Sequence, residues 1–244
     1  MGTAAAFDRR GDLATVLRLR EQIAGLQRRR ADPKALPVPD ALSPLFPDGG
    51  LRPGAAYALQ PGSTSLLLAL LGASSREGSW CAVVGLPELS VEAAEGHGVS
   101  LDRIALIPDP GDRWLQAASA AAEVFPLVAV RPPRRPAEAE AARLEARLRD
   151  RGGTLLALGD WPGVEAALSL GAPEWHGIGR GHGLLSERAV TVTLTGRRTP
   201  RPRSVRVLLP GPSGRIEPIG AEAIGAEAGA TGNAPRPRLR AVGA

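Results

Sequence analysis

The sequence predicts an α/β fold in which a mostly parallel sheet is flanked by helices. Short runs that are apolar throughout, such as 80–84 and 127–130, alternate with helical patterns along the centre of the chain. Strands of this kind are typical of a parallel sheet that is covered on both faces. Near the C-terminus, residues 189–195 and 204–209 instead alternate polar and apolar side chains, which favours a half-exposed antiparallel hairpin.

The composition agrees with one α/β domain and short extensions. The chain has 244 residues and a formal net charge of +5, which permits contact with nucleic acid or an acidic partner without establishing it. The lone cysteine, Cys81, excludes an internal disulfide framework and fits a reducing compartment. No apolar run approaches the roughly 20 residues that span a bilayer, and residues 1–10 carry no apolar signal segment. We therefore expect a cytoplasmic protein without membrane contact.

The first expected element is an N-terminal helix within residues 1–32, which begins after Asp12. Its apolar residues, spaced three or four apart, form one stripe: Val16, Leu19, Ile23 and Leu26. This stripe either packs against the chain's own domain or is offered to a partner or a second subunit. The prolines between residues 33 and 47 predict an extended, semi-rigid linker.

The core is expected to span residues 48–210. Strands are predicted at 55–60, 80–84, 104–107, 127–130 and 154–158, and helices at 64–75, 89–97, 112–123 and 164–170. A further helix is expected to have Pro136 in its first position and to end before Gly152. A glycine-rich loop at 172–186 then leads into the hairpin. Residues 211–244 are expected to form a flexible tail, because the chain past residue 220 holds too little apolar material to fold.

Residues 49–71 have the layout of a nucleotide-binding site but lack its chemistry. A glycine turn, a short strand and a second turn lead into a helix, as in a P-loop protein. A P-loop needs the pattern G-x-x-x-x-G-K-[ST], in which the lysine reaches the phosphates and the hydroxyl holds magnesium. No second glycine follows Gly62 here, and the only lysine in the chain is Lys34. The hydroxyl residues Ser63, Thr64 and Ser65 are expected to cap the helix instead.

The order of these parts, over roughly residues 10–210, resembles the RecA-like core. The segment 77–84 looks like the strand after the P-loop helix of that family, and segments 92–94 and 98–104 are similar to its next helix and strand. The resemblance places the family's catalytic glutamate at Pro87, with Glu88 one residue later. It places the magnesium-binding acid at Arg131, which would repel the metal. We therefore expect no ATP hydrolysis, no cofactor, no metal and no enzymatic activity.

A small RecA-like chain without ATP chemistry resembles the ImuA-type accessory factors of the mycobacterial mutasome. The resemblance implies a role in the SOS response, in translesion synthesis after DNA damage. Its implied partners are an ImuB-type inactive Y-family polymerase homologue and an error-prone C-family DNA polymerase, with single-stranded DNA or RecA as further candidates. A single-stranded DNA-binding RecA paralogue and a SulA-like cell division inhibitor are the alternatives.

Two segments supply candidate contact residues. In RecA-like recombinases the position of loop 174–183 holds a DNA-contacting loop, and here it offers Trp175, Arg180 and His182 for stacking or phosphate contact. An ordinary surface loop, or one ordered by a protein partner, explains it equally well. Arginines also crowd the hairpin turn, where they bind phosphate or an acidic partner, or form a solvated tip: Arg197, Arg198, Arg201, Arg203 and Arg206. His176 and His182 have no cysteine or carboxylate cluster beside them, so we expect no metal site.

Overall fold

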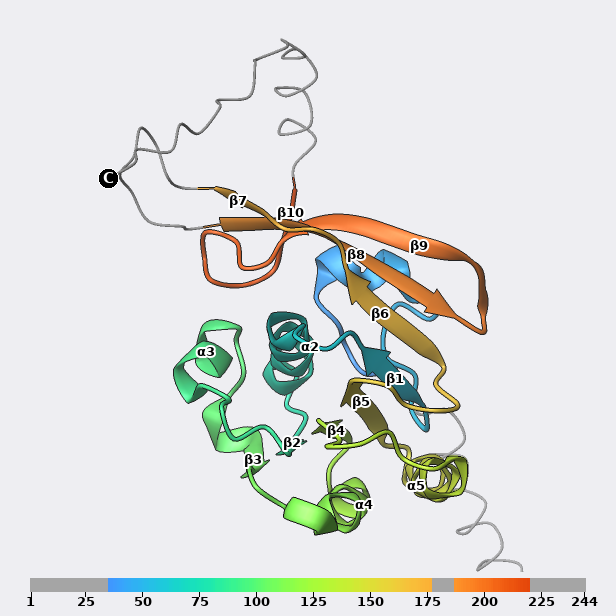
Figure 1. The fold of residues 1–244 in the computed structure, drawn as a ribbon. Coiled ribbons are helices and arrows are strands. Elements are labelled where there is room, and N and C mark those ends of the chain that lie inside the picture. Colours follow the sequence, from blue (N-terminus) through green and yellow to red (C-terminus); the bar gives the residue numbers. More distant parts are fainter. Residues whose placement is uncertain (1–34, 177–186, 220–244) are drawn as a thin grey trace, which may run out of the picture.

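The computed structural model describes residues 35–176 and 187–219, and within them ten strands form a single sheet (Figure 1). The strand order is β10-β9-β8-β6-β1-β5-β4-β2-β3, and β7 pairs with β8 beside this path. Five strands form the parallel half: β1 (Ala56–Leu59), β2 (Cys81–Val84), β3 (Ile104–Ile107), β4 (Leu127–Val130) and β5 (Thr154–Leu158). The predicted fold class is confirmed.

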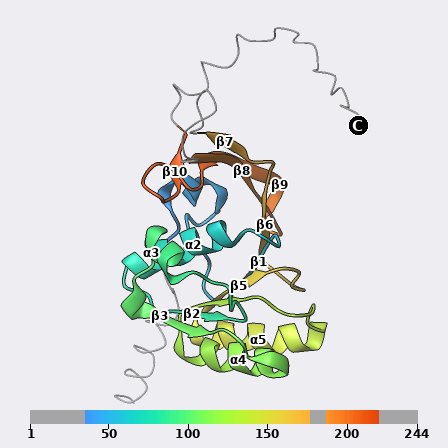
Figure 2. The ribbon, with the colours of Figure 1, turned by 60° about the vertical axis from the view of Figure 1, so that its left-hand side comes forward.

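Helices cover both faces of the parallel half, as Figure 2 shows. Helices α2 (Thr64–Arg76) and α3 (Val91–Gly96) pack on one face, and α4 (Trp114–Val124) and α5 (Glu138–Arg151) pack on the other. Each face has its own apolar core. Leu66 and Leu70 of α2 are fully buried on the first face, and Leu144 of α5 packs with Trp114 and Trp161 on the second. Two 3-10 turns, η2 (Leu101–Arg103) and η3 (Gly111–Arg113), precede β3 and α4.

The extended conformation expected for the linker 33–47 is wrong for residues 40–45. They form a 3-10 helix, η1 (Asp40–Leu45), whose Leu42 and Leu45 are completely or almost completely buried in the first core. Leu36 also pairs with Leu51 through two backbone hydrogen bonds of 2.8 and 2.9 Å. The apolar side chains between the prolines therefore bury themselves, because burial of each leucine is worth about 1.5–3 kcal/mol.

The helix expected at 164–170 is also wrong, because this segment is strand β6 (Ala166–Leu170). It runs parallel to β1 and antiparallel to β8, and so joins the parallel and antiparallel halves of the sheet. Its burial alternates, with Ala166 and Leu168 inside and Ala167 and Ser169 exposed. The partner strands on both sides decide its conformation. A further short strand, β7 (Glu174–His176), lies inside the expected glycine-rich loop.

The predicted C-terminal hairpin is present as β8 (Glu187–Gly196) and β9 (Thr199–Leu208), joined by the two-residue turn of Arg197 and Arg198. The chain then folds back over residues 211–216, and β10 (Glu217–Pro218) pairs with β9. The flexible tail expected from residue 211 is therefore wrong for residues 211–218. Residues 220–244, together with the N-terminal stripe of Val16, Leu19, Ile23 and Leu26, lie outside the described residues.

Helix α5 begins two residues later than its proline signal predicted. Ala137 is the N-cap residue, so Pro136 precedes the helix instead of occupying its first position. Glu140 accepts the backbone N–H of Ala137 at 2.8 Å and a bidentate pair of bonds from Arg134 at 2.9 Å. The Arg134 contact, followed by the Ala137 N–H, lowers the pKa of Glu140 to about 2. At the other end, Gly152 closes the helix with a left-handed φ of 71°, as expected.

Replacing Glu140 with glutamine is expected to destabilise the protein at neutral pH and to have no effect in strong acid. The folded-state pKa is depressed, so the carboxylate stabilises the fold above about pH 4.5 and loses this contribution as the pH falls towards about 2. Urea unfolding of both proteins at a series of pH values measures the difference. Glu138→Gln is the matched control, because Glu138 lies in the same turn and forms no ion pair with residues 35–176 or 187–219. A constant difference across this pH window would contradict the assignment.

None of the helices within residues 35–176 and 187–219 has both the length and the apolar character needed to cross a membrane.

Candidate functional site

The carboxyl ends of β1, β2 and β4 bring together the three positions where a RecA-like ATPase would hold its nucleotide. The loop of residues 60–63 follows β1, residues 85–88 follow β2, and Arg131 follows β4. In open α/β sheets, ligands bind in the crevice at this edge. The geometry of the three segments therefore decides what the site can do.

The loop after β1 is held by contacts within the protein. The Gln60 side chain accepts the backbone N–H of Leu170 at 2.9 Å, which ties the loop to the end of β6. The Ser63 hydroxyl donates to the Gln60 carbonyl at 2.5 Å, and no side chain of the described residues caps the helix at its Ser63 N-cap. The Ser65 hydroxyl accepts a hydrogen bond of 2.6 Å from Arg188. The expected side-chain capping is therefore wrong at the Ser63 N-cap, because the Ser63 hydroxyl bonds a carbonyl and the Ser65 hydroxyl bonds an arginine.

Arg131, at the position of the magnesium-binding acid, forms an ion pair with Glu88, the one acid near the position of the catalytic glutamate. The contact is bidentate, with Nη2 to Oε2 at 2.8 Å and Nη1 to Oε1 as its second bond. The Arg131 Nε also donates to the Gly85 carbonyl at 3.1 Å. This arginine lowers the pKa of Glu88 and occupies both of its carboxylate oxygens, which makes Glu88 a weaker proton acceptor.

Gly85 permits this close approach between the ends of β2 and β4. Its φ is +79°, and a Cβ at this position would lie only 2.7 Å from the Arg131 carbonyl oxygen. Beside the ion pair lies an open cleft of about 370 Å³, which is lined by Pro87, Asp109, Asp112, Trp114, Arg131 and neighbouring residues. In the part of the chain that the structure describes, no three His, Cys, Asp or Glu side chains gather as a metal site.

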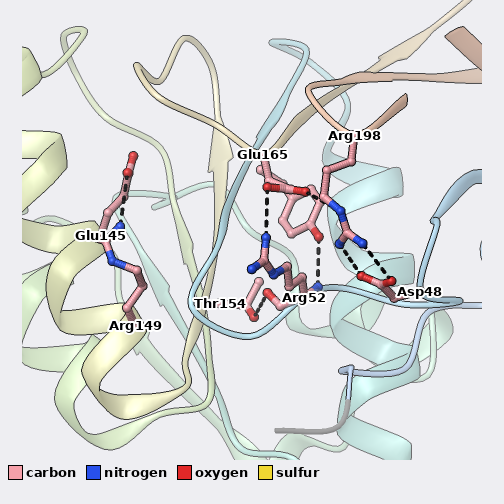
Figure 3. Close-up of polar contacts among 8 residues, drawn as sticks. Asp48, Arg52, Glu145, Arg149, Thr154, Glu165 and Arg198 are labelled. Carbon is pink, nitrogen blue, oxygen red and sulfur yellow. Dashed lines mark hydrogen bonds and ion pairs between the residues drawn. The ribbon is translucent and has the colours of Figure 1, made fainter. Parts of the chain in front are cut away.

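Most arginines of the hairpin are used to hold the fold together. Arg198 contacts Asp48 through bonds of 2.5 and 3.2 Å and lies 3.9 Å from Glu165, as Figure 3 shows. It is also the main cause of the lowered pKa of Asp48. Arg206 pairs with Glu174, and Arg203 donates to the Pro44 carbonyl at 3.3 Å. Three of the five predicted arginines therefore have partners within the fold, while Arg197 and Arg201 are exposed.

The contacts around Arg198 continue through Glu165 to Arg52 (Figure 3), whose backbone contacts the buried Tyr57. Arg52 lies 3.6 Å from Glu165, and its backbone N–H donates to the Tyr57 hydroxyl at 2.9 Å. Burial raises the pKa of Tyr57 to about 12. The Thr154 hydroxyl donates to the Arg52 carbonyl at 3.0 Å and closes the network towards β5. This network links the segment after η1, the residue before β6, strands β1 and β5, and the hairpin turn.

Of the candidate residues in loop 174–183, only Trp175 lies within the described residues. Trp175 lies on β7 with 49% of its surface exposed, and the guanidinium carbon of Arg188 lies 5.5 Å from its ring centroid. Arg180 and His182 lie outside the described residues. Sequence reasoning missed Arg188, because nothing in its neighbourhood indicates contacts with Ser65, which is 123 positions away.

Comparisons with known proteins agree with this fold. The model of a family described as the MT3502 N-terminal domain matches residues 44–163. The uncharacterised protein Rv3395c of Mycobacterium tuberculosis is 36% identical over 155 residues, which cover 61% of this chain and 76% of the relative. A crystal structure of the RadB recombinase is similar with a TM-score of 0.54 and 18% identity, over 74% of this chain and 97% of RadB. The chain therefore has a RecA-like fold and belongs to the protein family that Rv3395c represents.

Proposed function

We propose that this protein is a non-catalytic RecA-like accessory factor in damage-induced translesion DNA synthesis. The observation that carries the non-catalytic part is the ion pair between Arg131 and Glu88 at the carboxyl edge of the sheet. Phosphoryl transfer depends on a cation at the phosphates, a bound magnesium and a residue that orients the nucleophile. This chain has no lysine in its loop, an arginine where magnesium would be bound, and its nearest acid paired to that arginine.

The role itself rests on the resemblance to ImuA-type factors, and its support here is the RecA-like fold in a family that includes a mycobacterial protein. On this proposal the chain works through protein contacts. Its first partner is an ImuB-type inactive Y-family polymerase homologue, and the complex serves an error-prone C-family DNA polymerase. The cleft beside Arg131, which Asp109 and Asp112 also line, is the candidate surface for such contacts.

The test combines partner binding with nucleotide binding on the same purified protein. We expect a stable complex with the ImuB-type protein of the same genome in gel filtration at several salt concentrations. We also expect no heat of ATP binding in a calorimetric titration at millimolar nucleotide with magnesium, and the same result for Arg131→Asp, since the loop still lacks lysine. Absence of any complex would contradict the partner assignment. Saturable, magnesium-dependent ATP binding would contradict the non-catalytic assignment independently.

A further inference from the structure

Four basic side chains lie together on the α2 side of the sheet and form what we call the arginine track: Arg76, His97, Arg188 and Arg215. Arg76, at the end of α2, donates to the His97 carbonyl at 3.4 Å. Gly98 lies between two of the guanidinium groups, because a Cβ there would overlap Arg76 Nη1 and lie 3.5 Å from Arg215 Nε. The loop of residues 211–216 approaches the end of α3, since a Cβ at Gly214 would lie 3.6 Å from the Gly96 carbonyl oxygen (Figures 1 and 2).

The arginine track gathers like charges without a paired acid. Within the described ranges, neither Arg76 nor Arg188 nor Arg215 forms an ion pair, whereas Arg52, Arg131, Arg134, Arg198 and Arg206 all do. Burial and then the charge of Arg215 lower the pKa of Arg76, an effect that Asp40 and Glu77 oppose more weakly. Burial and then Arg188 lower the pKa of His97, whose Nδ1 is buried without a partner in this region. An anion on the track would relieve this repulsion.

The arginine track has the shape of a line. Arg188 contacts Ser65 in the first turn of α2, and Arg76 ends the same helix eleven residues later. Eleven residues are close to three full turns, so both positions lie on one side of α2, about 16 Å apart. His97 lies between them, because its carbonyl accepts a hydrogen bond from Arg76 and lies against Gly72 in the middle of α2. A linear polyanion fits this arrangement better than a single small anion does.

An exposed aromatic ring stands at the Arg188 end of the track. Trp175 is directly opposite Arg188 in the pairing of β7 with β8. Hydrogen bonds of 2.6 Å to the Leu209 carbonyl and to the Ser65 hydroxyl fix the Arg188 guanidinium beside the indole ring. An exposed indole beside a fixed cation is an arrangement on which unpaired bases stack. The carboxylates of an acidic peptide could pair with the arginines, but they would not stack on this ring.

We infer that the arginine track binds the phosphate backbone of single-stranded nucleic acid, with one base stacked on Trp175. The site differs from the hairpin arginines, which the fold uses for its own ion pairs and carbonyl contacts. It does not depend on the proposed partner contact, since it needs only this chain.

The test measures the anisotropy of a fluorescent oligodeoxythymidylate of about 16 nucleotides across a salt series with the full chain. Removing one phosphate contact with Arg215→Ala should reduce the slope of log affinity against log salt by about 0.7. Trp175→Ala should weaken binding roughly 5- to 150-fold, and Trp175→Phe should recover part of it. The matched control is Arg143→Ala, because Arg143 is an exposed arginine of α5 on the opposite face of the sheet. It should leave affinity and slope unchanged.

Several outcomes would overturn the inference. They are no binding by the unchanged protein, an equal loss with Arg143→Ala and Arg215→Ala, or duplex DNA binding as tightly as the single strand. Displacement of the oligonucleotide by poly-glutamate as readily as by inorganic polyphosphate would assign the track to an acidic protein segment instead. Circular dichroism of each variant separates loss of binding from loss of fold. Arg76→Gln provides a second site variant if Arg215→Ala disturbs the loop that carries it.

Discussion

Replacing Leu42 with alanine is expected to lower the free energy of unfolding by about 2–5 kcal/mol. Leu42 lies in η1 and has no exposed surface, so the truncated side chain leaves a cavity in the core beneath α2. If Leu42 lay in an extended, exposed linker, the same substitution would leave the free energy of unfolding almost unchanged. Urea unfolding measures the difference and thereby tests whether residues 40–45 are part of the domain.

Leu101→Ala is the control for Leu42→Ala. Leu101 lies in η2 and is 40% exposed, so its truncation should cost at most about 1 kcal/mol. Equal losses for the two variants, or no loss for Leu42→Ala, would show that η1 does not pack as described. The dependence of the unfolding free energy on urea concentration should stay the same in both variants. Neither substitution changes the surface exposed on unfolding to a large extent.

Replacing Gly72 with alanine is expected to destabilise the protein by about 1–3 kcal/mol, although alanine is the better helix former. Gly72 faces α3, and a Cβ at this position would overlap the His97 carbonyl oxygen. That oxygen belongs to the backbone, so α2 and α3 must move apart to admit the methyl group. Thermal unfolding of the purified variant measures the loss.

Gly96→Ala provides the comparison, since a Cβ at Gly96 meets nothing within 4 Å. With space available and a helical backbone, this change should be neutral or stabilise the protein by up to about 1 kcal/mol. A loss of stability in Gly72→Ala together with a gain in Gly96→Ala would show that close helix packing, and not helix propensity, decides the effect at Gly72. If both variants are stabilised, the close approach of α2 to the His97 backbone is wrong.

The sequence predicts the parallel strands well, because short runs that are apolar throughout are typical of strands buried on both faces of a sheet. The errors fall where local pattern is ambiguous. The segment Ala166–Leu170 is too short for its apolar residues to distinguish a helix from a strand, and only β1 and β8 on its two sides decide. In the segment around Leu42 the prolines indicate an extended chain, while the leucines between them are drawn into the core.

The candidate site could be predicted in its residues but not in its contacts. Glu88 and Arg131 each stand out beside the pattern of an ATPase, yet they are 43 positions apart and only the adjacent strands β2 and β4 bring them together. The hairpin arginines are obvious as a group, but their acid partners, such as Asp48, come from distant segments. Long-range pairing of charges has no local signature, so it emerges only with the fold.

The ion pair between Arg131 and Glu88 also joins the ends of two neighbouring strands by charge. On the proposal that the chain is non-catalytic, ATP chemistry would need a lysine in the loop after β1, an acid in place of Arg131 and a glutamate released from its pairing. An acid at 131 would stand beside Glu88 as a like charge at the ends of the adjacent strands β2 and β4. The positive charge of Arg131 therefore also holds these two strand ends together, and its replacement by an acid would turn an attraction into a repulsion.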